Sequence, residues 1–322
     1  HRDLHSFPTR RSSDLIEALL DGKDFPRRYI QYFSDIDPAS LSLLMQAWPK
    51  VKPSRKRSLL KQMEANLEED TLASYDDLAR ALLTDPDSSI RAAAIRLLAE
   101  SGDPKLVPSL VKILEADEDS ATRAEAATAL GQFVMLGELE EIPEKVHRQA
   151  EDALLHAASA EDREITRRAV EGLGFSSRPE VPPLIESAFR RADHAWRASA
   201  LFAMGRSNDD RWQEHVLGML VSEDTHERLA AVQAAGELGL AAARSMLIRL
   251  LEEEEADTIT SAAIWSLSEI GGEDARTYLE SLLDMTDDED QVEFLEEALE
   301  NLEFTEDLEH FDLMAFDPED EE

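Results

Sequence analysis

The chain has 322 residues, a formal net charge of −37 at pH 7 and no cysteine. The missing thiols exclude disulfides and thiolate zinc sites. The 70 acidic against 33 basic side chains argue against nucleic-acid binding, which uses lysine and arginine to neutralise phosphates. No apolar run approaches the roughly 18 residues of a membrane-spanning helix, so we expect a cytoplasmic protein without a membrane segment. The charge favours solubility, and it also permits a basic protein partner.

Residues 1–15, HRDLHSFPTRRSSDL, contain no apolar stretch of a secretion signal and no amphipathic helix of a transit peptide. Back-translated, this segment resembles, codon for codon, the adapter DNA of a common short-read sequencing method. We therefore expect residues 1–15 to be non-native and the genuine segment to begin near Ile16. Residues 16–69 are then expected to form an N-terminal helical cap and a divergent first repeat.

A basic cluster follows in the stretch PKVKPSRKRSLLK, residues 49–61. It has no interleaved aromatic side chains, and residues 63–322 behind it carry 21 basic and 63 acidic side chains, a net charge of −42. We interpret the cluster as a solvated loop between helices, with contact to an acidic protein or to nucleic acid as the alternatives. Its basic members are Lys50, Lys52, Arg55, Lys56, Arg57 and Lys61.

An internal repeat occupies residues 70–303. Each clear copy begins with Asp, places a common slot four residues later, and has small or apolar residues three, four and seven positions after the slot. This spacing predicts a helix with one apolar face, and the Asp is expected to cap its N-terminus. Successive slots from residue 91 lie 32, 43, 31, 31, 32 and 32 residues apart. The opening residues are Asp87, Asp119, Asp162, Asp193 and Asp224, and the slots are Arg91, Arg123, Thr166, Arg197, Arg228, Thr260 and Val292.

The Asp-x-x-x-Arg-x-x-Ala starts, the Leu-Gly ends at residues 130–131 and 173–174 and the segment GDPKLVPSLVKIL resemble short HEAT-like repeats, a variety also found in phycobilin lyases. The resemblance implies an all-α fold, a right-handed α-solenoid of about eight helical hairpins whose second helices line a concave face. It also implies a structural ladder in which slot arginines pair with opening aspartates of neighbouring repeats. The expected ladder residues are Asp87, Arg91, Asp119, Arg123, Asp193, Arg197, Asp224 and Arg228.

The one long spacing, from slot 123 to slot 166, marks an insertion between residues 134 and 162. We expect it to lengthen the first helix of its pair and the preceding loop. A binding role for the insertion is the alternative.

Signatures of catalysis are missing from the sequence. There is no complete dinucleotide or phosphate loop and no Gly-x-Ser-x-Gly. Beyond residue 15 no two histidines stand three or four residues apart, and the acidic runs at 252–255 and 287–290 lack the glycine and spacing of a calcium loop. We therefore predict a non-enzymatic protein without a catalytic residue, cofactor or metal.

Positions five and nine residues after each slot should point away from the apolar face. Aromatic and arginine side chains dominate protein interfaces, so we predict a scaffold or adaptor that binds a protein partner along this surface. Packing between adjacent repeats is the alternative for Phe202 and Trp265. The candidate partner-binding residues are Arg96, Arg168, Phe202, Arg206, Gln233 and Trp265.

A second hypothesis follows from the resemblance to phycobilin lyases, namely a bilin-lyase-like enzyme that uses the concave face. It requires a chromophore-sized pocket with a carboxylate or arginine beside it.

The acidic tail, residues 304–322, is separate from both hypotheses. We expect residues 304–316 to cover the apolar end of the last repeat and the final six residues to be disordered, with folding on a partner as the alternative.

Overall fold

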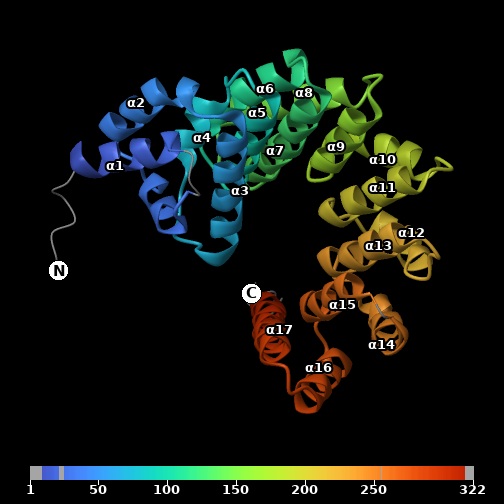
Figure 1. Cartoon of the computed structure of the whole chain (residues 1–322). Helices are drawn as coiled ribbons and strands as arrows, with labels where there is room; N and C mark the ends of the chain where they lie inside the picture. The colour runs from blue at the N-terminus through green and yellow to red at the C-terminus, as the bar shows by residue number, and fades with distance from the viewer. Residues whose placement is uncertain (1–8, 22–24, 255, 316–322) are drawn as a thin grey trace, which may run out of the picture. The chain divides into compact units, whose positions relative to one another are not determined.

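The computed structural model describes residues 9–21, 25–254 and 256–315, with side chains between residues 15 and 307 of those ranges. Every regular element in this described part is helical, and it contains no strand (Figure 1). The chain divides into two compact units, unit 1 ending at Gly172 and unit 2 beginning at Leu173. The expected all-α fold is therefore confirmed, and the division into units is a feature that the sequence did not indicate.

The N-terminal part of unit 1 holds the helices α1 (Thr9–Leu20) and α2 (Pro38–Ala47) and two short 3₁₀ segments, η1 (Arg27–Phe33) and η2 (Trp48–Lys50). Helix α1 runs across the expected boundary at residue 15, and Leu15 and Leu19 are buried. The expectation for residues 1–8 lies outside the described residues. The backbone therefore shows no break where the sequence changes character.

Helical pairs follow along the rest of the chain, and the described part contains seven pairs and one further first helix. The first helices carry the slots and are α3 (Pro53–Glu69), α5 (Ser88–Arg96), α7 (Ser120–Glu138), α9 (Arg163–Leu173), α11 (His194–Arg206), α13 (Thr225–Glu237), α15 (Asp257–Ile270) and α17 (Glu289–Ala315). The second helices are α4 (Asp76–Leu82), α6 (Val107–Ala116), α8 (Glu144–Ala157), α10 (Val181–Phe189), α12 (Gln213–Met219), α14 (Arg244–Glu253) and α16 (Glu273–Met285). Short 3₁₀ turns precede three of them, η3 (Pro104–Leu106), η4 (Asp210–Trp212) and η5 (Ala241–Ala243). The stacked hairpins make each unit a length of α-solenoid, as the sequence predicts.

The opening aspartates cap the first helices as expected. Asp87 accepts a hydrogen bond from the Ser89 backbone N–H, and Asp119 accepts one from Thr122. Asp224 accepts two, from the backbone N–H groups of residues 226 and 227. Each bond pairs one of the N–H groups that a helix N-terminus leaves without an intrahelical partner, so the repeated aspartate fixes where each helix begins.

The apolar stripe of each first helix forms the core. The alanines three residues after the slots are fully buried, and their small side chains let neighbouring helices approach closely. In unit 2 the first helices α11, α13 and α15 lie next to one another in a row. The second helices α10, α12 and α14 lie along one side of this row (Figure 1). The fully buried alanines are Ala94, Ala126, Ala169, Ala200, Ala231 and Ala263.

The basic cluster of residues 49–61 is not a solvated loop, and that interpretation is wrong. Most of it forms the start of α3, because Pro53 suits the first turn of a helix and a regular helix follows. Lys56 is buried and donates to Asp85 at 3.0 Å, while Arg57 donates to Asp87 at 2.8 Å. Two of the six positive charges of the cluster are thus neutralised by carboxylates of unit 1.

The insertion lengthens helices. Helix α7 spans 19 residues and α8 spans 14, whereas α5, α11 and α13 span 9 to 13. The expected lengthening of the first helix is found in α7, and the second helix of the pair is long as well. The extra turns bring the end of α7 against α8.

The last described helix, α17, packs its buried Leu295, Ala298 and Leu302 against α15 and α16. It continues through residues 304–307 of the expected tail, where Glu306 accepts hydrogen bonds from the Gly272 backbone N–H at 3.2 Å and from Arg276 at 2.6 Å. The expectation for residues 317–322 lies outside the described residues. Among the described helices, none combines the length and apolar character that crossing a bilayer requires.

Candidate functional site

The six candidate partner-binding residues all lie on first helices, but in two different units. Arg96 on α5 and Arg168 on α9 belong to unit 1. Phe202 and Arg206 on α11, Gln233 on α13 and Trp265 on α15 belong to unit 2. They are therefore considered as two separate sets.

The two arginines of unit 1 are held by carboxylates. Arg96 bridges neighbouring repeats, since it donates to Glu64 at 3.0 Å and to Glu125 at 2.9 Å. Arg168 donates to Glu164 at 2.9 Å and to Glu171 at 3.0 Å, both on its own helix. These ion pairs raise the pKa of both guanidinium groups against the opposing effect of burial. The structure thus gives both Arg96 and Arg168 carboxylate partners within unit 1.

In unit 2, by contrast, Arg206 joins two aromatic rings into one cluster. Its guanidinium carbon lies 3.8 Å from the centre of the Phe202 ring and 4.7 Å from the centre of the Phe175 ring. An arginine over a ring face is attracted by the negative charge of that face. Phe202 is half-buried, so it both packs and presents surface.

Trp265 forms a second aromatic cluster on α15. Its ring stacks on that of Phe294 with centres 6.5 Å apart and an angle of 26° between the planes, and its indole Nε1–H donates to Glu269 at 3.1 Å. The Trp265 residue is 39% exposed although it is large and apolar. An exposed tryptophan held in place on both sides is suited to anchor a partner, because little side-chain entropy is lost on binding.

Glycines bring the first helices of unit 2 into backbone contact between these clusters. A Cβ on Gly205 would lie 2.9 Å from the Ala234 Cα, and one on Gly236 would lie 2.8 Å from the Ser266 Cα. The carboxylate of Glu237 lies over Gly205, and that of Glu269 lies over Gly236. The glutamate nine residues after the slot of one repeat therefore covers the glycine eight residues after the slot of the preceding repeat.

The two aromatic clusters of unit 2, together with Gln233 and Glu237, form one continuous surface, which we call the first-helix face of unit 2. Successive first helices contact one another extensively, whereas contacts between successive second helices in this unit are few. The resemblance implies a concave face lined by second helices, whereas the candidate residues, placed by their spacing from the slots, lie on the first helices. Its members are Phe175, in the turn that follows α9, and the first-helix residues Phe202, Arg206, Gln233, Glu237, Trp265, Glu269 and Phe294.

The carboxylates of this face lie in an environment that disfavours their charge. Although the Glu237 residue is exposed, its carboxylate lies against the Gly205 backbone, and loss of solvent there raises its pKa to about 7. Arg206 opposes this rise, and Glu269 adds to it. Burial also raises the pKa of Glu269, with the Trp265 hydrogen bond acting in the opposite direction. The face can therefore gain stability from a positively charged group placed beside the two carboxylates.

Replacing Glu237 by glutamine is expected to stabilise unit 2 at pH 8 and to change little at pH 4. Because the folded pKa lies above the ordinary value of 4.5, stability falls as the pH rises from about 4.5 to about 7, and the full cost is present above pH 7. Allowing for solvent around this exposed residue, we expect a gain of about 1 kcal/mol at pH 8. Urea unfolding at both pH values measures it, with Glu214→Gln on α12 as an exposed control. An equal effect at both pH values would contradict the assignment.

A contact of the expected ladder type joins Asp87 to Arg57 of α3, which is not one of the expected ladder arginines. Elsewhere the arginines bond other groups. Arg91 donates to Asp117 at 2.6 and 2.7 Å, Arg197 to Glu227 at 2.5 Å and Arg228 to Glu254 at 2.9 Å. Arg123 donates to the Leu114 carbonyl at 2.7 Å. The pairing expectation is wrong for these arginines, because the opening aspartates are directed at their own helix N-termini.

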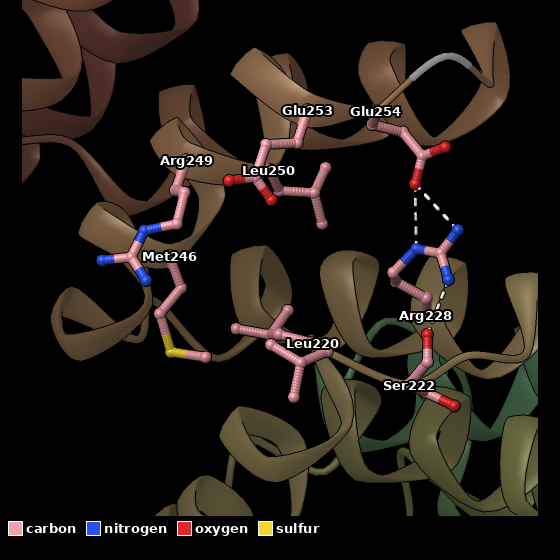
Figure 2. Close-up of a pocket in the computed structure, with 9 residues that line it drawn as sticks. Leu220, Ser222, Arg228, Met246, Arg249, Leu250, Glu253 and Glu254 are labelled. Atoms are coloured by element: carbon pink, nitrogen blue, oxygen red, sulfur yellow. Dashed lines mark hydrogen bonds and ion pairs between the residues drawn. The ribbon is translucent and has the colours of Figure 1, made fainter.

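A pocket of about 380 Å³ lies between the end of α12, the start of α13 and α14 (Figure 2). In Figure 2 the Arg228 guanidinium faces Glu254 and the Ser222 carbonyl, to which it donates at 2.6 Å. Leu220, Met246 and Leu250 supply the apolar lining. Arg228 is thus already bonded to Glu254 and to the Ser222 carbonyl, so we place the candidate site on the first-helix face instead.

Two groups of described residues have the composition and proximity to hold a metal ion. One is Glu138, His147 and Glu151, and the other is His194, Asp224 and Glu227. A pattern of paired histidines detects neither group, because each contains a single histidine with two carboxylates. Glu138 and Glu151 come from α7 and α8, whereas Asp224 and Glu227 both belong to the start of α13. The His147–Glu151 spacing of four residues is the signal that points to the first group.

The stacked hairpins and the continuous surface define an α-solenoid repeat protein. Models of HEAT repeats match residues 75–144, 181–267 and 213–300, which together cover more than half of the chain. The chain therefore belongs to the HEAT-repeat family. The expected resemblance to this family is confirmed.

Solved structures with similar helical arrangements share little sequence with the chain. The complex of CpcE and CpcF of phycocyanin lyase from Nostoc has 19% identity and a TM-score of 0.48, covering 70% of this chain and 94% of that chain. The YibA protein of Escherichia coli has 14% identity and a TM-score of 0.43, covering 88% and 99%. Human deoxyhypusine hydroxylase has 17% identity and a TM-score of 0.34, covering 92% and 96%. Comparison with curated protein sequences finds no match.

Proposed function

We propose that the chain is a non-enzymatic scaffold that binds a basic segment of a protein partner on the first-helix face of unit 2. The exposed, fixed Trp265 beside the carboxylate of Glu269 carries this proposal. Aromatic side chains supply contact area at interfaces, and carboxylates of raised pKa gain when a cation approaches. The net charge of −37 supports a basic partner, because it attracts positive segments over a distance.

The proposal is tested with a panel of Lys/Arg-rich peptides, using fluorescence anisotropy and the full chain. Trp265→Ala is expected to weaken binding at least tenfold, since truncation of an aromatic hot-spot residue costs about 2 kcal/mol or more. Phe304→Ala provides a matched control, because Phe304 is an exposed aromatic residue of unit 2 outside the first-helix face. Binding should also weaken as salt increases.

Equal binding by wild type and Trp265→Ala would contradict the site, and binding insensitive to salt would contradict the basic partner.

The alternative function, a bilin-lyase-like enzyme, is tested with the same purified protein. Titration with a free bilin followed by absorbance should then show no shift, and a shift removed by Trp265→Ala would favour the alternative.

A further inference from the structure

The long hairpin of α7 and α8 brings an imidazole between two carboxylates. His147 and Glu151 lie one turn apart on α8, and Glu138 is the last residue of α7. The His147 Nε2 atom lies 3.8 Å from a Glu138 oxygen and 3.7 Å from a Glu151 oxygen. Both distances are too long for a direct hydrogen bond from the imidazole, and the ligand atoms of the three groups lie within 4.8 Å of one another.

The histidine is held in this position by the backbone of α7. Its ring lies against Gly137, at the place where any other residue would carry its Cβ. Gly137 directly precedes Glu138, so the residue that makes room for the ring is next to one of the carboxylates. The three side chains are 14%, 27% and 5% exposed for His147, Glu138 and Glu151, so the site is largely shielded from water.

The His147 Nε2 atom is buried and has no hydrogen-bond partner. A buried polar nitrogen without a partner is costly, and native structures usually satisfy it. An ion bound between Nε2 and the two carboxylates would satisfy it. Metal–nitrogen and metal–oxygen bonds of about 2.0–2.2 Å place the ligands of a tetrahedral ion about 3.4 Å apart. The observed 3.7 and 3.8 Å need only a small side-chain adjustment to reach that spacing.

We infer that Glu138, His147 and Glu151 form a binding site for one divalent transition-metal ion. One imidazole nitrogen and two carboxylate oxygens suit Zn²⁺, Co²⁺ or Mn²⁺, while Mg²⁺ and Ca²⁺ prefer ligands that are all oxygen. The ion would tie the end of α7 to α8 within the insertion that distinguishes this repeat. This site is independent of the first-helix face and of the function proposed for it.

The second group of possible ligands is less suited to a cation. Glu227 already accepts hydrogen bonds from Arg197 at 2.5 Å and from Ser222 at 2.6 Å. The Arg197 guanidinium also lies 3.1 Å from the His194 Nδ1 atom. A fixed positive charge at this distance repels a metal ion. The carboxylate of Glu227 is therefore already neutralised by Arg197, and this group provides an internal comparison for the metal site.

The test uses the full chain, stripped with a chelator and titrated with Zn²⁺ by calorimetry and with Co²⁺ by visible absorption. We expect one ion per chain and a Co²⁺ spectrum of nitrogen and oxygen ligands. His147→Gln and Glu138→Gln should each weaken Zn²⁺ binding at least about tenfold and alter the Co²⁺ spectrum. Glu138→Gln keeps the test decisive if His147→Gln does not fold, because Glu138 is the most exposed of the three ligands.

His156→Gln is the matched control, since His156 lies exposed on the same helix outside the site, and His194→Gln tests the other group. Both variants should bind Zn²⁺ like the wild type. The inference is overturned if the wild type binds no Zn²⁺ at millimolar concentration, which would leave His147 as an ion-paired histidine only. It is also overturned if Glu138→Gln binds as well as the wild type, or if only His194→Gln loses the ion.

Discussion

Replacing Asp85 by alanine is expected to destabilise unit 1 by about 3–5 kcal/mol. The Asp85 carboxylate is buried and accepts from the Trp48 indole N–H at 2.7 Å, the Lys56 ammonium at 3.0 Å and the Asp87 backbone N–H at 2.9 Å. Alanine leaves the Lys56 charge buried and unpaired, since this side chain is only 8% exposed. Urea unfolding and hydrogen exchange of peptides from α3 and α5 measure the loss.

Arg27→Ala is the matched control for Asp85→Ala in the same unit. The Arg27–Glu69 pair is short, at 2.6 Å, but its side chains are 73% and 62% exposed. Exposed pairs contribute about 0–1 kcal/mol, because water screens them in both states. If both variants lost the same stability, the burial of Asp85 would not be the cause. Asp85→Asn should lie between the two, since an amide oxygen can still accept from Trp48.

The local rules of helix formation explain why the repeats could be predicted. An aspartate such as Asp119 or Asp224 specifies a helix start because its carboxylate accepts from backbone N–H groups only two or three positions ahead. The buried alanine at position three, for example Ala231, follows from helical spacing alone. Both features need no knowledge of distant parts of the chain.

The partners of long side chains could not be predicted in this way. Arg228 reaches Glu254 and Arg91 reaches Asp117, each 26 residues ahead, and several carboxylates stand within reach in so acidic a chain. The buried Lys56 was missed for the same reason, because its partner Asp85 lies beyond the next helix. On the candidate face the aromatic residues Phe202 and Trp265 were found from spacing. The raised pKa of Glu237 depends instead on how closely Gly205 lets the helices approach.

Replacing Gly236 by alanine is the second change with a large expected effect. A Cβ at this position would lie 2.8 Å from both the Cα and the Oγ atoms of Ser266, where backbone cannot move without shifting α15. We expect a loss of about 2–3 kcal/mol, typical of adding a methyl group to a packed interface, although alanine is the better helix former. Urea unfolding of the full chain measures it.

Gly218→Ala makes the same chemical change in α12, where an added Cβ meets nothing within 4 Å. This control should gain up to about 1 kcal/mol from helix propensity alone, so the two alanine variants are expected to change stability in opposite directions. Gly236→Ala should also displace Glu269, which lies over the glycine, and thereby disturb its hydrogen bond with Trp265. Tryptophan fluorescence of the folded variant follows that change. If Gly236→Ala were as stable as Gly218→Ala, close helix contact would not be what shapes the first-helix face.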